Sequence, residues 1–591
     1  MIVPMKKSSI IILAKDTQNC LIELRRLGVL HIEHNQVPQG RDITILKEEI
    51  ILLNDALGIL IQTDPSCPSL VENAEVKVDD WRNIARHIID KRKRIEHAEE
   101  YARNLSVQIE LWKPWGDFDP EEIKKLREKD IYIKLYQVPH KNIKELPRDL
   151  AIKTIFTEKG IAHCLAVGQN EFSLSFKEIS LPHMGLEAMR KRLLENTEAL
   201  KGLDEDLRSS CNYYQRLIEI KKKLGKELEM QEAMRGMGEA GELAYVTGYI
   251  PFDAAQSLSD LAKKERWGIS ITDPSEEDSV PTLIRNKRWI TTISPLFKML
   301  EVIPGYRELD VSPLVLIFFS LFFAMIIGDA GYGLIFFSLT AFAHKKMGKK
   351  IHDKTAFFLL YVLSSCTILW GLVTGTFFGQ EWNLRVGLKP LIPALTNTKV
   401  LQTFCFFLGA LHLTLAHLWR ALRQFPALTA CAEIGWIAVL WAAFFLAKTL
   451  ILDDMFPFFG KWLIIGGVFL VIFFSSPQRN ILKTIAKGIA SVALSLVNNF
   501  TDVVSYIRLF AVGLAGVAIA DTVNTLAVSA GGTNWLIKVP ILLVGHTINF
   551  VLGPVGVLVH GVRLNVLEFS SHIGVSWSGV NFKPLKEYEK E

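Results

Sequence analysis

The second half of the sequence is dominated by apolar segments, each long enough to cross a lipid bilayer. They begin just after Asp310 and follow one another to the end of the chain. A soluble domain has no core large enough to bury so many segments of this kind. The half before Asp310 is instead rich in Lys, Glu and Arg. The sequence therefore predicts an integral membrane protein that carries a large polar domain.

About eight of the apolar segments are expected to span the membrane. They lie at residues 312–328, 330–344, 355–378, 400–419, 429–449, 460–475, 488–527 and 535–569. Basic loops fall on one side of this arrangement and the acidic LDDMF loop on the other, and basic loops remain in the cytoplasm. Both termini are therefore predicted to be cytoplasmic, with the chain in the cell (inner) membrane. The first two segments are short, so a re-entrant hairpin is the alternative there.

The polar half is predicted to be a cytoplasmic dumbbell, in which an antiparallel coiled coil joins two α/β lobes. Apolar residues recur every seven positions along two long helical segments, as they do in coiled coils. The expected domains are a cytoplasmic domain at 1–311, made of a proximal lobe (1–40 and 240–300), a coiled-coil rod (41–113 and 183–239) and a distal lobe (114–182), and a transmembrane domain at 312–591. A rod with a lobe at each end indicates an interaction stalk without chemistry of its own.

Composition speaks against several classes of function. The formal net charge of +5 is small for 591 residues, which argues against nucleic-acid binding. The chain has no GxxxxGK[ST] phosphate loop, so any ATP involved would be bound by another protein. Its seven cysteines form no CxxC pair, which argues against a zinc site and a disulfide framework. We therefore expect no catalytic residue, no cofactor and no metal ion.

The last two predicted spans are unusually long and carry polar stripes, so both are expected to tilt strongly. On the first, Asn498, Asp502 and Ser505 share one helical face, and Arg508 lies at the edge of that face. On the second, six residues fall within about one-third of the circumference. These are His546, Asn549, Gly553, Gly556, His560 and Arg563.

Two arginines inside apolar spans require an explanation. A charge at the bilayer centre costs at least ~2.5–3.5 kcal/mol. A single such arginine could extend to the interface or pair with Asp502 or Glu568. Two arginines on two adjacent, overlong, striped helices favour a function instead.

Arginine remains protonated at physiological pH, so each is a permanent positive charge. Such a charge favours the ionised form of a carboxylic acid that passes it, and it blocks the direct passage of cations. Water and proton relays on either side could be provided by Asp502, Asn498, Ser505, His560 and Glu568. This combination predicts two half-channels separated by an arginine barrier.

Several motifs resemble subunit a (subunit I) of the V-type and A-type rotary ATPases, in particular the prokaryotic members. The motifs are SYIRLFAVGLA at 505–515, LVHGVRLNVLEF at 558–569, PLVLIFFSLFFAMIIGDAGYG at 313–333 and KKSSIIILAKDTQNCLIELRRLGVLHIEH at 6–34. The resemblance covers essentially the whole chain. At two positions the chain departs from it, because Gly553 and Gly516 stand where some members of the family carry Glu and His.

The resemblance implies a membrane-embedded stator subunit that couples ATP hydrolysis or synthesis to proton translocation, with sodium as the alternative ion. It implies that Arg508 and Arg563 face the carboxylates of a rotating proteolipid c-ring. Further implied partners are peripheral stalk subunits of the E/G type, a central-stalk connector of the d/C type and the lipid bilayer.

Two other classes of membrane protein compete with this hypothesis. An independent secondary transporter with a regulatory coiled-coil stalk is the first, but such transporters commonly contain inverted repeats. The spans show no internal repeat, and both arginines lie near the C-terminal end. A membrane receptor that signals through its coiled coil is the second, and it leaves the two arginines unexplained.

Overall fold

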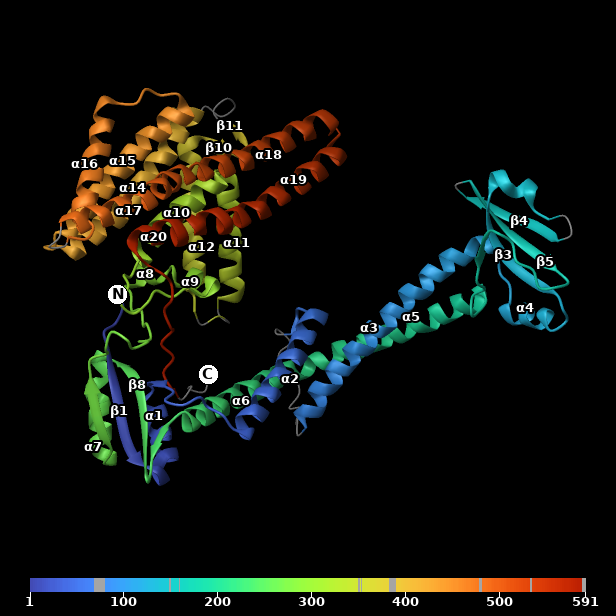
Figure 1. Cartoon of the computed structure of the whole chain (residues 1–591), viewed down its shortest axis with the longest axis horizontal. Coiled ribbons are helices and arrows are strands. Elements are labelled where there is room, and N and C mark those ends of the chain that lie inside the picture. The colour runs from blue at the N-terminus through green and yellow to red at the C-terminus, as the bar shows by residue number, and fades with distance from the viewer. Residues whose placement is uncertain are drawn as a thin grey trace. The chain divides into compact units, whose positions relative to one another are not determined.

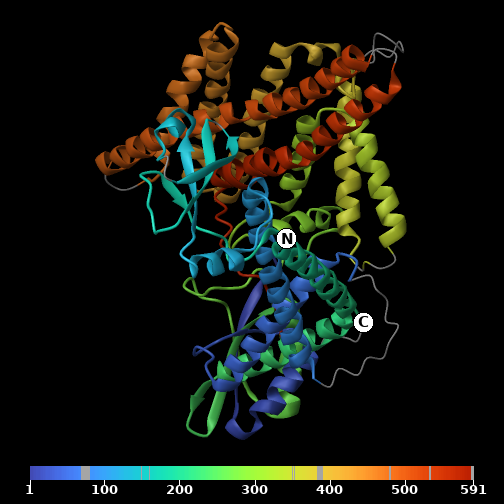
Figure 2. The same cartoon turned by 90° about the vertical axis from the view of Figure 1, so that its right-hand side faces the viewer.

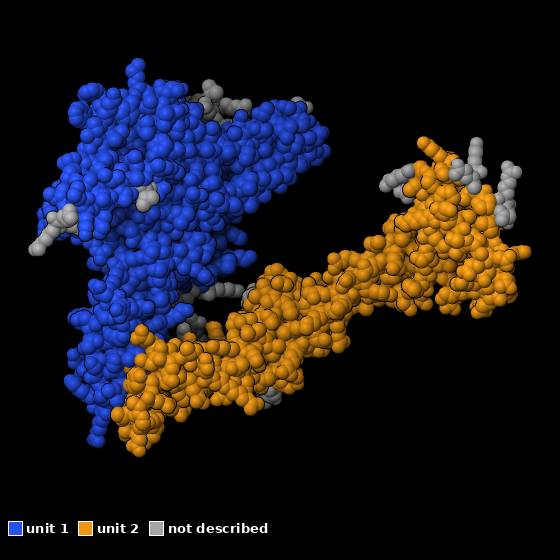
Figure 3. Space-filling model, in the orientation of Figure 1, with its two compact units in different colours: residues 1–11, 24–32, 247–591 blue, residues 12–23, 33–246 orange. Residues whose placement is uncertain are grey.

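The computed structural model describes residues 1–67, 80–147, 150–158, 160–348, 351, 353–381, 390–477, 481–531 and 534–586. The chain divides into two compact units (Figure 3). Unit 1 contains residues 1–11, 24–32 and 247–591, and unit 2 contains 12–23 and 33–246. The two units do not divide at residue 311. The domain boundary expected there remains a prediction.

Unit 2 is built on two pairs of helices that pack side by side (Figure 1). One pair is α2 (Arg41–Thr63) with α6 (Tyr214–Arg235), and the other is α3 (Trp81–Trp112) with α5 (Leu186–Ser209). Their facing residues form a common apolar core that includes Leu53, Ile88 and Leu217. Long helices therefore lie where the heptad pattern predicts them, while the coiled coil and the dumbbell remain predictions.

The far end of these helices carries a small α/β lobe with an antiparallel sheet in the order β4-β5-β3-β6. Its elements are α4 (Pro120–Arg127), β3 (Tyr132–Pro139), β4 (Ala151–Glu158), β5 (Ile161–Gly168) and β6 (Lys177–Ile179). Alternate residues of β3 and β5, such as Tyr136 and Cys164, are buried, as expected for a sheet with one face packed on a core.

One pair of cysteines forms a disulfide, although the cysteine spacing argued against a disulfide framework. Cys67, after α2, is bonded to Cys211, which lies in a single 3-10 turn (Ser210–Tyr213) between α5 and α6. The two residues are 144 positions apart, so only the packing of the helices brings them together, and sequence spacing could not reveal it. Asp64 lies close to both sulfurs. Because these two cysteines are joined in a disulfide, they are not free to bind a metal ion.

Another sheet, in the order β2-β8-β1-β9 with β7 paired to β8, combines strands from both ends of the polar half. Strands β1 and β9 pair antiparallel, with Ser9 opposite Ser270. The elements are β1 (Met5–Leu13), α1 (Thr17–Leu27), β2 (His31–Glu33), β7 (Gly238–Ala240), β8 (Leu243–Pro251), α7 (Ala255–Glu265) and β9 (Gly268–Thr272). Short helices α8 (Arg288–Thr291) and α9 (Ser294–Leu300) lead to the apolar half.

A helix lies at each of the eight predicted span positions. The helices are α10 (Ser312–Ile327), α11 (Ala330–Met347), α12 (Thr355–Thr374), α14 (Thr398–Gln424), α15 (Thr429–Leu452), α16 (Phe458–Phe474), α17 (Ile481–Ser505) with α18 (Ile507–Gly531), and α19 (Trp535–Gly556) with α20 (Ser570–Ile573). Strands β10 (Thr376–Phe377) and β11 (Gln380–Glu381) form a hairpin after α12. Among the described residues, five helical segments are long and apolar enough to cross a bilayer, so the count of eight remains a prediction.

The two long C-terminal elements are not the uniform helices that the sequence predicted. The first is 50 residues long and is broken between α17 and α18 at Tyr506. The second contains Pro540 and Pro554 and continues beyond α19 as two π-helical turns, Val557–Gly561 and Leu564–Phe569. A proline inside a helix removes a backbone hydrogen bond, which gives a reason for the irregular hydrogen bonding after Pro554.

Glu308 holds the chain after α20 against the segment that precedes α10. Its carboxylate accepts hydrogen bonds from the backbone N–H groups of Gly305 at 2.6 Å and Ser576 at 2.8 Å, and from the Ser576 hydroxyl. Burial alone would raise the pKa of Glu308, but the hydrogen bonds from Ser576 and Gly305 outweigh burial. The pKa of Glu308 is therefore lower than its ordinary value.

Glu308→Gln is expected to destabilise this attachment by about 2 kcal/mol at pH 7, because a hydrogen-bonded charge is lost. The pKa of Glu308 is lower in the folded state, so its contribution to stability is fully present above the unfolded pKa of about 4.3. This contribution disappears as the pH falls through the folded pKa. The difference in Tm between variant and parent should therefore close on acidification. The exposed Glu276→Gln is the control, and a difference that does not change with pH would contradict the role of the carboxylate.

Candidate functional site

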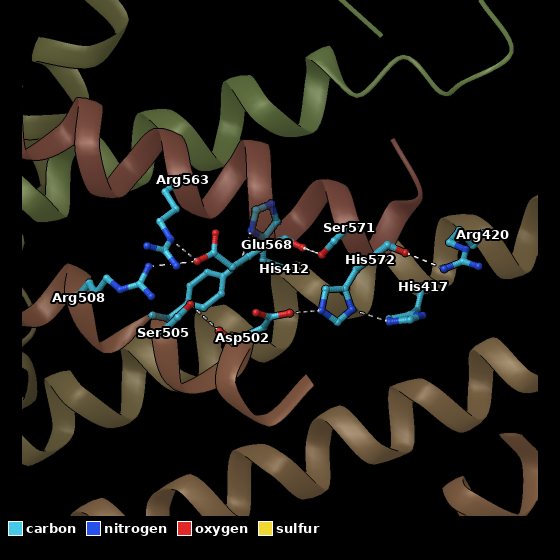
Figure 4. Close-up of polar contacts among 11 residues, drawn as sticks. His412, His417, Arg420, Asp502, Ser505, Arg508, Arg563, Glu568, Ser571 and His572 are labelled. Carbon is cyan, nitrogen blue, oxygen red and sulfur yellow. Dashed lines mark hydrogen bonds and ion pairs between the residues drawn. The ribbon is translucent and has the colours of Figure 1, made fainter. Parts of the chain in front are cut away.

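The C-terminal helices bring polar side chains together inside the apolar half of the protein (Figure 4). Tyr506, at the break between α17 and α18, is fully buried, and its hydroxyl lies 2.8 Å from Nδ1 of His412 on α14. Arg508 follows in the first turn of α18. Arg563 lies between the two π-helical turns, which are often found at functional sites.

Both arginines pair with the same carboxylate. Arg508 Nη1 lies 3.1 Å from Glu568 Oε1, and Arg563 Nε lies 3.2 Å from the same oxygen. The Glu568 side chain is only 5% exposed, while those of Arg508 and Arg563 are 28% and 53% exposed. One carboxylate cannot balance two guanidinium groups, so one positive charge remains in excess. The other oxygen, Glu568 Oε2, has no hydrogen-bond partner within the described part of the chain.

A second set of ionisable groups forms a continuous chain beside this pair, and Figure 4 shows its part from Asp502 to His417. Asp502 Oδ2 lies 3.0 Å from His572 Nε2, and His572 Nδ1 lies 2.9 Å from His417 Nε2. His417 Nδ1 lies 2.6 Å from Glu433 Oε2, and Arg420 Nη2 lies 2.9 Å from Glu433 Oε1. The four residues from Asp502 to Glu433 come from α17, α20, α14 and α15, so tertiary packing creates the chain.

Four of the seven predicted site residues surround one cavity of about 520 Å³, which Arg508, His560 and Ser505 do not line. Arg563, Glu568, Asp502 and Asn498 all line it. Ser505 is buried, and its hydroxyl donates to the Asp502 carbonyl at 2.7 Å, a local bond within the last turn of α17.

His560 lies on the first π-helical turn, half-buried and within electrostatic range of both arginines. The sequence patterns did not identify His572, Glu433 and Arg420 as members of this site. For Glu433, a carboxylate inside a predicted span was the signal that could have identified it.

The comparisons with known proteins agree on one family. No family model matches the sequence. The chain is 31% identical to V-type ATP synthase subunit I 1 of Treponema pallidum, over 99% of this chain and 100% of the relative. It is 32% identical to V-type ATP synthase subunit I of Borreliella burgdorferi, over 100% of both chains. The A-type ATP synthase subunit I of Methanocaldococcus jannaschii is 24% identical, over 68% of this chain and 62% of the relative.

The chain belongs to the subunit I family of V-type and A-type ATP synthases. The resemblance that the arginine motifs indicated is thereby confirmed. As a subunit I, the protein is a non-catalytic part of a rotary ATPase. Its long apolar helices make it a membrane-integral part.

The chain contains a second cavity, of about 110 Å³, farther along α18 and α19. Gly516 and Gly553 both line it. An added Cβ would lie 3.7 Å from Asn549 Oδ1 at Gly516, and 3.5 Å from Ile327 Cγ1 at Gly553. Both are ordinary contacts, so close packing does not require glycine at either position. The larger cavity is lined by residues before Arg508 on α17 and by residues from Arg563 onward, whereas the smaller is lined by residues after Arg508 on α18 and before Arg563 on α19. Helices α18 and α19 run side by side (Figure 1 and Figure 2).

Polar side chains continue from the second cavity toward the α18–α19 turn. The Tyr332 hydroxyl lies 2.7 Å from His546 Nδ1 and accepts a hydrogen bond from Asn549 at 3.0 Å. His546 Nε2 lies 3.0 Å from Asn524 Oδ1. His546 and Asn549 belong to the polar stripe that the sequence predicted, and Tyr332 on α11 completes the group.

Proposed function

We propose that this subunit I provides two ion half-channels, separated by Arg508 and Arg563, that open toward a rotating proteolipid c-ring. One observation carries the proposal: both guanidinium groups share a single buried carboxylate, and a cavity lies on each side of them. A pair of permanent charges between a larger polar cavity and a smaller, mostly apolar one is a barrier to cations that still lets ions approach from either side.

The exposed surface of the C-terminal helices fits the side that meets the ring. In the most apolar window of the segment Trp535–Ile573, only 11% of the residues are buried within the chain. Large apolar side chains such as Val551, Val555 and Val559 are exposed there. A row of proteolipid helices would bury these side chains and would bring its carboxylates past Arg508 and Arg563.

Glu568 gives the arginines a counter-charge between encounters with the ring. A ring carboxylate that reaches Arg508 competes with Glu568 for the guanidinium and is favoured in its ionised form, so it releases its ion. The excess positive charge at the pair makes this exchange possible without leaving an arginine unpaired. After the carboxylate has passed, Glu568 recovers both arginines.

The two cavities supply the aqueous connections. The larger, lined by Asn498 and Asp502, lies on the side of the C-terminus and is assigned to the cytoplasmic half-channel, together with Ser505. The smaller, with Tyr332, His546 and Asn549, is assigned to the opposite side. His560 lies between them. The carried ion is a proton, with sodium as the alternative, because the chain of imidazole and carboxyl groups suits proton transfer.

The rest of the chain serves as stator. The paired helices and the lobe of unit 2 are suited to bind peripheral stalk subunits of the E/G type. The sheet around β1 is suited to lie near a central-stalk connector of the d/C type. Both termini are placed in the cytoplasm, and the apolar half in the cell (inner) membrane.

An independent transporter is the alternative, and reconstitution separates the two. The purified chain alone in liposomes is expected to carry no gradient-driven proton flux above that of protein-free liposomes. The assembled complex, reconstituted in the same lipid, is expected to acidify the vesicles on addition of ATP. Because each half-channel leads only to the ring, transport should need both components. Substantial proton flux through the chain alone would contradict the stator function and support the transporter.

A further inference from the structure

The side chains from Asp502 to Glu433 form a connected network, which is more than the lining of a channel requires. His572 and His417 bridge the two carboxylates through contacts of 3.0, 2.9 and 2.6 Å. The His417, Glu433 and His572 side chains are at most 6% exposed, and that of Asp502 is 24% exposed. Buried ionisable groups in a membrane domain are costly, so their persistence here calls for a function.

The protons in this chain can be counted. An ionised carboxylate only accepts, so His417 Nδ1 must donate to Glu433 and His572 Nε2 must donate to Asp502. The two remaining nitrogens face each other at 2.9 Å, and one of them must also carry a hydrogen. Three N–H groups on two imidazoles is one more than two neutral imidazoles possess. The contacts therefore require one excess proton, on an imidazole or on a carboxyl group.

The surrounding charges agree with this count. Arg420 pairs with Glu433 at 2.9 Å and donates to the His572 carbonyl at 3.0 Å. Two carboxylates are then balanced by Arg420 and the excess proton, so the set is neutral only when that proton is present. The ionisable groups nearest to this set of residues are Tyr506, His412, Arg563 and Glu568. Arg563 and Glu568 belong to the arginine pair, and His412 bonds to Tyr506.

We infer that the Asp502–His572–His417–Glu433 chain stores one proton beside the arginine pair and relays it to the ring. The inference rests on the proposed function, and it assigns His572, His417 and Glu433 to proton transfer. One proton leaves Asp502 through water in the 520 Å³ cavity, which also reaches Arg563 and Glu568. The N–H bonds of the imidazole pair then shift toward Asp502, and one proton is taken up at the Glu433 end, beside the partly exposed Arg420. One proton enters for each that leaves, and no electrons move.

The test is ATP-driven proton uptake by inverted vesicles that contain the assembled complex. His572→Gln and His417→Gln keep side chains of similar size that donate and accept hydrogen bonds, but glutamine cannot bind an extra proton. Each is expected to lower the initial uptake rate at least about tenfold, because a positioned proton relay contributes ~10²–10⁴-fold in comparable reactions. His344→Gln is the matched control, because His344 lies on α11, contacts the Tyr361 hydroxyl and is not one of the four residues from Asp502 to Glu433.

Chemical rescue distinguishes a relay from a structural histidine. In His572→Ala, added imidazole is expected to enter the cavity and restore uptake in proportion to its concentration, whereas cyclopentanol does not. Loss of uptake that imidazole fails to restore would give His572 a structural role and overturn the inference. Normal uptake in both glutamine variants, with uptake abolished in Arg508→Gln, would overturn the relay and leave the proposed function intact. Normal uptake in Arg508→Gln as well would overturn the proposed function itself.

Discussion

Arg508→Gln is expected to lower ATP-driven proton uptake by the assembled complex by about 100-fold or more. Glutamine keeps a polar side chain, but it is two atoms shorter than arginine and carries no charge. A ring carboxylate arriving at this position would keep its proton, because nothing would favour its ionised form. Removal of one preorganised charge-stabilising group in a water-poor site typically costs ~10²–10³ in rate. Uptake is measured as dye quenching in inverted vesicles after addition of ATP.

The controls for Arg508→Gln separate loss of charge from loss of assembly. The variant should co-purify with the ring and the stalks, because within the described ranges Arg508 forms an ion pair with Glu568 alone, and Tyr506 contacts His412 independently of it. Arg423→Gln is the matched control, since Arg423 is an exposed arginine on α14 that donates to a backbone carbonyl. Uptake equal to that of Arg423→Gln, in an assembled complex, would show that Arg508 is structural.

Much of the fold could be predicted because its signals are local. Apolar segments of sufficient length marked the helices of the membrane half, and heptads marked the long helices of unit 2. Other features depend on packing between distant parts of the chain. The disulfide joins Cys67 to Cys211, and the helix break falls at Tyr506, whose hydroxyl contacts His412 on α14. No pattern within one segment records such contacts.

The site was predictable where a charge interrupts an apolar pattern. Arg508, Arg563, Asp502 and Glu568 were identified in this way, and three of the four lie in direct ion pairs with one another. His572 was missed because it lies beyond the predicted end of the last span at residue 569.

Arg420 was counted as part of a basic loop, although it pairs with Glu433. Gly516 and Gly553 were noted as departures from the family pattern, and only the structure shows that both line the same cavity. In each case the two residues lie on consecutive helices, and the packing of those helices brings them to one place.

Glu568→Gln is expected to impair both stability and transport, because it removes the carboxylate that both arginines share. Breaking a buried ion pair on one side typically costs about 3–5 kcal/mol, since the remaining charge is left uncompensated. Here two guanidinium groups would be left without their carboxylate in a low-dielectric site. We expect a lower Tm of the purified complex and a proton uptake reduced at least about tenfold, whereas Glu568→Asp should retain more of both.

A double-mutant cycle decides whether Glu568 acts through the arginines. If the carboxylate mainly compensates their charge, Arg563→Gln should offset part of the stability lost in Glu568→Gln, because the double variant leaves one uncompensated charge instead of two. The expected coupling is about 0.5–3 kcal/mol, as found for directly interacting groups. Additive losses would mean that the Glu568 side chain stabilises the fold by contacts other than its ion pairs with the arginines. If the two substitutions are coupled in their effect on stability and transport is also lost, Glu568 acts as the counter-ion that the arginines exchange for the ring carboxylate.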